Sequence, residues 1–296
     1  MPTEETTDAA SGAGDLGAAV RAAATRLSEA GVPSPEHDAL ALAAHVLGRP
    51  VGELRTAMVL GASAPDPTAY ARLVEHRADR VPLQHLTGRA AFRRLELSVG
   101  PGVFTPRPET EVVAGLAIEA ALAVDAEPVV VDLCTGSGAI ALAIADEVPR
   151  ATVHAVELGE DAHAWAARNV ADTGLDVTLV HGDATTAFPE LDGTVDVVVS
   201  NPPYIPVGMV PVDPEVRDHD PELALYGGSE DGLAIPLAVA ARAAVLLRPG
   251  GVLVMEHADS QGALLPAALE RTGQWVDVRD ERDLTGRPRA TVAVRA

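Results

Sequence analysis

The strongest constraint on the fold is a regular alternation of short apolar runs and helix-like segments that begins near residue 128. The run at 129–133 is apolar except for Asp132, as expected for a strand that is buried on both faces. Further strands are predicted at 152–157, 176–180, 195–200, 251–256, 275–279 and 290–295, with helices at 139–147, 160–172, 232–247 and 260–272. This order predicts an α/β fold with a doubly wound, mainly parallel sheet of seven strands.

The residues before the alternation have a different character. Residues 1–14 are polar and acidic, and we expect a disordered tail there. From residue 15 apolar residues recur at helical spacing, and Ser34-Pro35 and Asp66-Pro67 are helix-start signals in which the Ser or Asp side chain caps the helix. We therefore predict a helical N-terminal domain at 15–85, a connector with a short β-hairpin at 86–106 and a second domain at 107–296, with a long loop at 205–231.

Charge and cysteine content exclude several classes of function. The net charge is −21, and all 22 cationic side chains are Arg, so lysine Schiff-base chemistry and a Walker A phosphate loop are excluded. Such acidity disfavours direct binding to nucleic acid. The single Cys excludes a disulfide framework, and no metal-ligand spacing is present. Without a signal peptide or an apolar span, we expect a cytoplasmic monomer with no membrane partner and no bound metal.

Polar residues gather where the first three predicted strands end. Asp132 is followed by the turn Cys134-Thr135-Gly136-Ser137-Gly138, whose glycines allow close approach of a ligand to the backbone. The order G-S-G-A-I-A also fits the dinucleotide fingerprint, which by itself is a weak signal. Glu157 ends the second strand, where a carboxylate can accept hydrogen bonds from ribose hydroxyls. Asp183 follows the third strand and is a candidate acceptor for an adenine amino group.

The fourth strand runs into Asn201-Pro202-Pro203-Tyr204. Two successive prolines stiffen the chain, so that the Asn201 side-chain oxygen and the Pro202 carbonyl can act together as two acceptors for a planar NH₂ group. Tyr204 offers a flat face on which a planar amide or base can stack.

These motifs resemble those of class I methyltransferases that use S-adenosylmethionine. Segments at 82–88, 105–111, 224–233 and 255–257 narrow the resemblance to the protein-(glutamine-N5) methyltransferases of the HemK/PrmC type. The resemblance implies methyl transfer from S-adenosylmethionine, with S-adenosylhomocysteine as product, to the GGQ glutamine of peptide chain release factors. It also implies that the helical domain docks this protein substrate. Cys134 is a departure, because the family often has glycine there.

The resemblance also implies roles for individual residues. Arg107 and Glu109 would wall the pocket. The implied catalytic residues are Asn201, Pro202 and Tyr204, and together with Pro203 they would bind the substrate. The implied cofactor-binding residues are Asp132, Cys134, Thr135, Gly136, Ser137, Gly138, Glu157, Asp183, Ala184 and Asn201.

Other functions fit part of the pattern. An N6-adenine methyltransferase would use the same four-residue motif on a base, although the charge of −21 opposes it. The same reaction on a ribosomal protein would need the same pocket. An NAD-dependent dehydrogenase would fit the glycine turn, but it would leave residues 201–204 without a function. A binding module without catalytic activity would require a site that has lost its motif residues.

Overall fold

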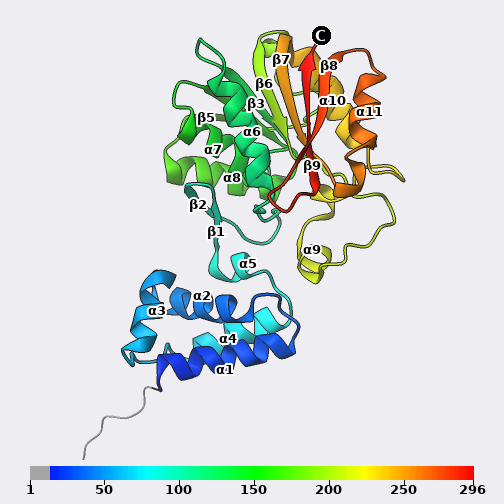
Figure 1. The fold of residues 1–296 in the computed structure, drawn as a ribbon. Helices are drawn as coiled ribbons and strands as arrows, with labels where there is room; N and C mark the ends of the chain where they lie inside the picture. Colours follow the sequence, from blue (N-terminus) through cyan, green and yellow to red (C-terminus); the bar gives the residue numbers. More distant parts are fainter. Residues whose placement is uncertain (1–13) are drawn as a thin grey trace, which may run out of the picture. The chain divides into compact units, whose positions relative to one another are not determined.

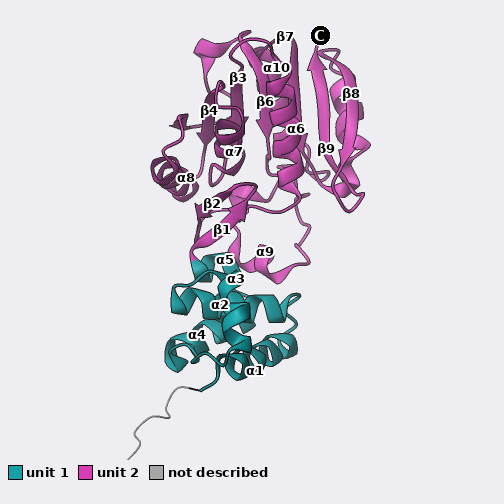
Figure 2. Cartoon of the chain, turned by 60° about the vertical axis from the view of Figure 1, so that its left-hand side comes forward, with its two compact units in different colours: residues 1–87 teal, residues 88–296 magenta. Residues whose placement is uncertain are grey.

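The computed structural model describes residues 14–296, so the tail predicted at 1–14 lies, except for Gly14, outside the described residues (Figure 1). The chain divides into two compact units, one that ends at Thr87 and one that spans Gly88–Ala296 (Figure 2). None of the helices between residues 14 and 296 has the length and apolarity that a membrane span requires.

The first unit is a small helical bundle. Its core is aliphatic and includes Leu16, Leu27, Leu42 and Leu54, all buried. A buried ion pair from Arg77 Nε to Asp38 Oδ2, 2.7 Å long, links the fourth helix to the second. The helices are α1 (Leu16–Glu29), α2 (Pro35–Leu47), α3 (Val51–Val59), α4 (Pro67–Ala78) and α5 (Leu83–Thr87), the last of which the sequence analysis does not predict.

Helix capping in this unit follows the sequence signals in part. Asp66 caps α4, because its carboxylate accepts a hydrogen bond from the Ala69 N–H at 2.7 Å. The predicted Ser34 side-chain cap is wrong, since Ser34 precedes α2 without a side-chain hydrogen bond to the helix. Pro35 at the first helical position supplies the backbone angle that starts α2 there.

The second unit begins with a hairpin and continues into a seven-stranded sheet. The hairpin pairs β1 (Arg89–Phe92) with β2 (Leu95–Ser98). The sheet has the order β5-β4-β3-β6-β7-β9-β8, in which only the pairs β7–β9 and β8–β9 are antiparallel. Its strands are β3 (Val129–Leu133), β4 (Thr152–Glu157), β5 (Val177–His181), β6 (Val195–Ser200), β7 (Leu247–Glu256), β8 (Trp275–Arg282) and β9 (Pro288–Arg295). The predicted doubly wound, mainly parallel seven-stranded sheet is confirmed.

Helices cover both faces of this sheet (Figure 1). Because side chains alternate along each strand, both faces carry apolar residues that these helices bury. On β6, Val197 packs with the core under α6 and α7, whereas Val198 packs with the core under α10 and α11. The helices of this unit are α6 (Thr110–Leu122), α7 (Ala139–Glu147), α8 (Glu160–Thr173), α9 (Pro214–His219), α10 (Ala234–Leu246) and α11 (Leu264–Glu270).

The prediction of one long loop at 205–231 needs correction. The segment contains α9 and a 3-10 turn at Glu222–Ala224. The signal for α9 is visible in the sequence, since Asp213-Pro214 repeats the Asp-Pro pattern that starts α4. The Asp213 side chain accepts a hydrogen bond from the Glu215 N–H at 3.3 Å.

Asn169 on α8 joins the hairpin to the turn after β3. Its side-chain oxygen accepts from the Ser98 N–H at 2.7 Å, and its amide donates to the carbonyls of Ser98 and Ser137 at 3.0 and 2.9 Å. The side chain is buried, so water cannot replace these bonds.

We expect Asn169→Ala to lower the free energy of unfolding by about 3 kcal/mol, because it leaves a buried N–H and two carbonyls without partners. Urea denaturation measures this loss. Asn169→Asp retains the acceptor for the Ser98 N–H. Its free energy of unfolding should therefore lie between that of the wild type and that of the alanine variant. A loss below about 1 kcal/mol in the alanine variant would contradict the assigned role.

Candidate active site

The carboxyl ends of β3, β4, β5 and β6 surround a cavity of about 540 Å³. Strand order reverses beside β3, since β4 and β6 lie on its two sides, and such a reversal opens a crevice for ligands. The predicted residues that line the cavity are Cys134, Thr135, Gly136, Ser137, Glu157, Asp183, Ala184, Asn201, Pro203 and Tyr204, with Arg107 and Glu109 from the loop before α6. Asp132, Gly138 and Pro202 lie outside this lining.

The turn after β3 has an unusual backbone. Cys134, Gly136 and Gly138 all have positive φ, at 66°, 58° and 83°. Glycine adopts this conformation freely, whereas a residue with a Cβ is strained in it. Cys134 therefore occupies a position that favours glycine. Burial also raises the pKa of its thiol, so the thiol stays protonated and is a poor nucleophile.

Asp132 holds this turn from behind the cavity wall. Its Oδ2 accepts hydrogen bonds from the Thr135 hydroxyl at 2.6 Å and from the Ala141 N–H at 3.2 Å. The side chain is fully buried, and this burial raises the pKa of the carboxyl to about 7. Asp132 therefore orders the turn.

Glu157 connects the turn to the end of β4. Its Oε2 accepts from the Gly136 N–H and its Oε1 from the Gly159 N–H, both at 2.8 Å. Each carboxylate oxygen can accept a second hydrogen bond, so the side chain keeps acceptor capacity toward the cavity. Asp183 uses Oδ1 for the Thr185 N–H and hydroxyl, at 2.8 and 2.7 Å.

The segment after β6 contributes the most distinctive side chain. Asn201 lines the cavity, and among residues 14–296 its amide group has no hydrogen bond. The preceding Ser200 is buried and donates to the Leu133 carbonyl at 2.6 Å, which joins the ends of β3 and β6. Gln261 Nε2 donates to the Tyr204 carbonyl at 2.9 Å and secures the other end of the segment. The structure thus brings an unpaired amide and the glycine turn to one cavity.

A wall that the sequence analysis does not predict comes from the segment with α9. Val216, Pro221 and Leu223 line the cavity and make that side apolar. Arg107 donates to Asp220 Oδ2 at 2.9 Å and ties this wall to the loop before α6. The Asp213-Pro214 signal could have revealed the helix, but no local pattern indicates that it faces the cavity.

Comparison with known proteins agrees with this geometry. Residues 18–88 match the family described as the PrmC N-terminal domain, and residues 95–209 match the methyltransferase small domain. A crystal structure of a methyltransferase from Pyrococcus furiosus superimposes with a TM-score of 0.50 at 20% identity, over 78% of this chain and 98% of that chain. The fold and the site together define a class I methyltransferase.

Sequence relatives define the family more closely. The chain is 56% identical to the release factor glutamine methyltransferase of Streptomyces coelicolor, over 94% of this chain and 98% of the relative. It is 49% identical to that of Mycolicibacterium smegmatis, over 95% and 98%. The chain belongs to the release factor glutamine methyltransferase family. A further relative, at 42% identity over 88% and 89%, is the 4-amino-L-phenylalanine/4-methylamino-L-phenylalanine methyltransferase of Streptomyces pristinaespiralis.

The Asp132 carboxyl should make stability depend on pH. Its pKa rises from 3.8 to about 7 on folding, so the native state binds more protons than the unfolded state between these values. Its contribution is complete at low pH and is lost as the pH rises through about 7. We expect the unfolding free energy of Asp132→Asn to fall less steeply over this range than that of the wild type. Denaturation at several pH values tests this, with the exposed Asp125→Asn as control. Parallel curves for the wild type and Asp132→Asn would contradict it.

Proposed function

We propose that the chain transfers a methyl group from S-adenosylmethionine to the side-chain amide nitrogen, N5, of a glutamine in peptide chain release factors. The observation that carries this proposal is the unpaired Asn201 amide, which lines the same cavity as the glycine turn after β3. The names of the relatives at 56% and 49% identity support the same reaction.

The residues at the strand ends suit the methyl donor. We assign the turn Thr135–Gly138 to its methionine part, Glu157 to the ribose hydroxyls, and Asp183 with Ala184 to the border of the adenine. The open space above Gly136, where an added Cβ would meet no atom within 4 Å, leaves room for such a ligand. When bound, S-adenosylmethionine supplies a methyl group on a positively charged sulfur, so the departing thioether requires no acid.

The task of the protein is then alignment and placement of charge. An amide nitrogen is a weak nucleophile, because its lone pair is delocalised into the carbonyl. We assign the Asn201 oxygen and the Pro202 carbonyl as acceptors for the two N–H groups of the substrate amide, with Pro203 and Tyr204 packing on its plane. These acceptors localise the lone pair and stabilise positive charge that develops on nitrogen, and one N–H proton then leaves the methylated nitrogen for solvent. Holding the reactants in line contributes up to about 7–11 kcal/mol in well-oriented systems.

We also propose that the helical unit, residues 15–85, docks the protein substrate.

The relative from Streptomyces pristinaespiralis gives a second candidate function. Its name describes methylation of an arylamine nitrogen on a small molecule, and this chain is 42% identical to it. Parallel incubations distinguish the two candidate functions: the enzyme and the methyl donor are incubated with a release factor in one and with 4-amino-L-phenylalanine in the other. Mass spectrometry should find one added methyl group on a release factor glutamine. Methylation of the small molecule alone would favour the second candidate.

Asn201→Ala should lower kcat for glutamine methylation by at least about 100-fold, because it removes an acceptor that stabilises developing charge. Calorimetry should find that S-adenosylmethionine still binds, with a smaller loss of affinity than in Glu157→Ala, since this variant leaves the glycine turn and Glu157 intact. Asn201→Asp retains an acceptor and should keep more activity than the alanine variant. Near-normal turnover of Asn201→Ala would remove this residue from the mechanism.

Glu157→Ala should weaken S-adenosylmethionine binding by about 10- to 100-fold, through the loss of acceptors for the ribose and of the hydrogen bond that orders Gly136. Isothermal titration calorimetry measures the affinity. The exposed Glu190→Ala serves as a control for the loss of a carboxylate elsewhere. Unchanged affinity in Glu157→Ala would refute the ribose assignment.

A further inference from the structure

A buried carboxyl group lies next to the candidate active site without lining it. Glu256 is the last residue of β7 and is 1% exposed. The strand residues before it, Leu253, Val254 and Met255, are fully buried apolar residues. A carboxyl at this depth is unfavourable unless a partner compensates it. The role proposed for the cavity does not explain why an acidic side chain stands here.

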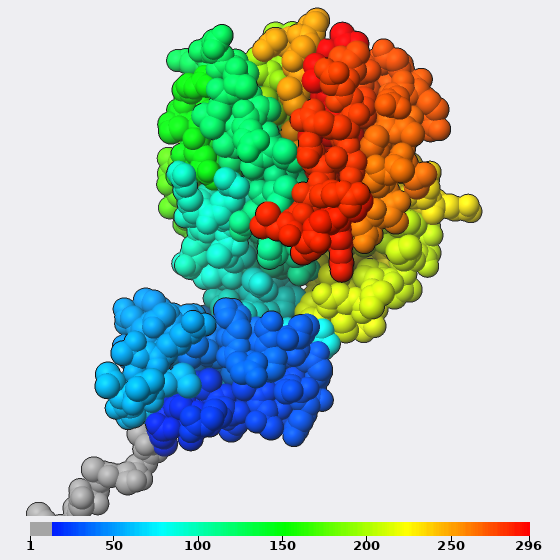
Figure 3. Space-filling model, viewed as in Figure 1, coloured from blue at the N-terminus to red at the C-terminus, as the bar shows by residue number. Residues whose placement is uncertain are grey.

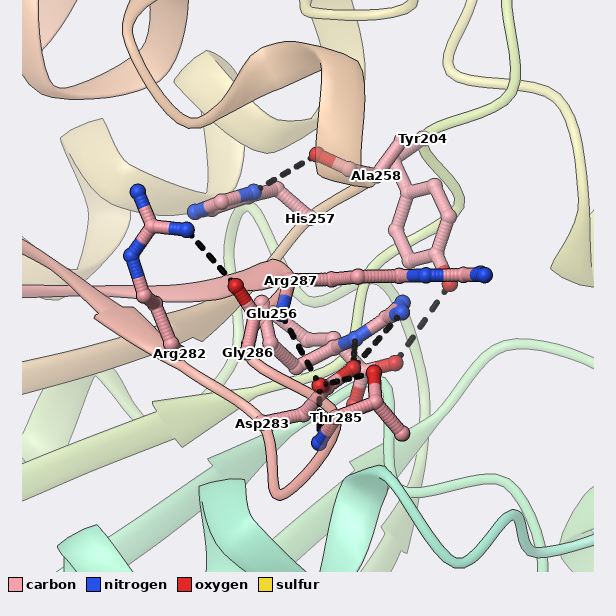
Figure 4. Close-up of polar contacts among 10 residues, drawn as sticks. Tyr204, Glu256, His257, Ala258, Arg282, Asp283, Thr285, Gly286 and Arg287 are labelled. Carbon is pink, nitrogen blue, oxygen red and sulfur yellow. Dashed lines mark hydrogen bonds and ion pairs between the residues drawn. The ribbon is translucent and has the colours of Figure 1, made fainter.

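The contacts of Glu256 point toward the 201–204 segment. The Tyr204 hydroxyl donates to Glu256 Oε1 at 3.4 Å (Figure 4). The other oxygen of this carboxylate, Oε2, is buried, and so is the Thr110 hydroxyl. Neither atom has a hydrogen-bond partner among residues 14–296. Tyr204 also lines the cavity, so this residue links Glu256 to the space proposed for the substrate amide.

An arginine from the neighbouring strand supplies the opposite charge. Arg289 on β9 favours the ionised form of Glu256. Asp283 holds this arginine, with its Oδ2 3.4 and 3.3 Å from Arg289 Nε and Nη2. The turn that carries Asp283 is ordered by its own hydrogen bonds, since Asp283 Oδ1 also accepts from the Thr285 and Arg287 N–H groups. This turn lies on the surface of the second unit, where the C-terminal strands appear red in Figure 3.

The charged groups around Glu256 come from three further elements. Tyr204 and Arg289 face it from the loop after β6 and from β9, and Glu109 faces it from the loop before α6. The adjacent His257 has its Nε2 3.2 Å from Asp280 Oδ1. Burial raises the pKa of Glu256 to about 7, Glu109 adds to the rise, and Arg289 opposes it.

We propose that Glu256 is a positioning residue for methyl transfer: its carboxylate accepts the hydrogen bond of the Tyr204 hydroxyl and so fixes the Tyr204 ring against the substrate amide. This inference rests on the proposed function. A structural role alone predicts a loss of stability, whereas the positioning role predicts a slower chemical step with the cofactor still bound. Ionised Glu256 accepts a charge-assisted hydrogen bond from Tyr204, which is stronger than a neutral one. Turnover should therefore rise as the pH rises through the titration of Glu256.

The test compares Tyr204→Phe, Glu256→Gln and the double variant with the wild type. Each single variant should lower kcat by about tenfold, because it loses one hydrogen bond to a charged group. The affinity for S-adenosylmethionine should stay unchanged. The double variant should resemble the single ones, because all three break the same contact. The rise of kcat near neutral pH should be absent in Glu256→Gln. The exposed Glu270→Gln on α11 is the matched control and should behave as the wild type.

A second measurement does not depend on activity. The chain has 3 Tyr residues, so ring resonances of tyrosine-labelled protein are few, and loss of a signal in Tyr204→Phe assigns Tyr204. The Tyr204 signal should shift with a midpoint near pH 7 in the wild type and not in Glu256→Gln. If the wild type does not methylate glutamine, the proposed function fails and this titration still tests the contact. Tyr204 signals that titrate alike in both proteins, or kcat effects that multiply in the double variant, would overturn the inference.

Discussion

The reversal of strand order beside β3 is the constraint on which the site depends. Because β4 and β6 lie on opposite sides of β3 in one parallel sheet, their carboxyl ends must meet above it. Polar side-chain contacts then hold the three ends together: Ser200 donates to the Leu133 carbonyl, and Glu157 accepts from the Gly136 N–H. Sheet topology and these contacts together bring residues that are far apart in the chain to one cavity.

Around this frame, the structure separates residues that face the cavity from residues that order them. Asp132 and Asn169 are buried and hydrogen-bond the turn after β3 without lining the cavity. We assign Glu256 a similar place behind Tyr204. In each case a buried polar side chain makes at least one hydrogen bond to a residue or turn of the cavity wall and so restricts its conformation.

The residues that face the cavity also bear on substrate specificity among the relatives of this chain. Relatives at 56% and 42% identity are named for substrates as different as a protein glutamine and a free aromatic amino acid. Glutamine and 4-amino-L-phenylalanine, which these names contain, both carry an NH₂ group on a planar carbon. The apolar wall with Val216 and Leu223 lines the same cavity, so its shape limits which substrate side chain can enter.

Local sequence patterns determined the elements and the chemistry of the strand ends. Short apolar runs that alternate with helix-like segments were enough to predict the seven strands, and the polar residues after β3, β4, β5 and β6 were visible as motifs. Only the tertiary structure decided which of these residues face the cavity, because facing depends on packing across the sheet. It placed Asp132, Gly138 and Pro202 outside the lining, formed the wall from the segment with α9 and brought Glu256 to Tyr204. Such contacts join β6, β7 and β9 across long stretches of chain, and no local pattern encodes them.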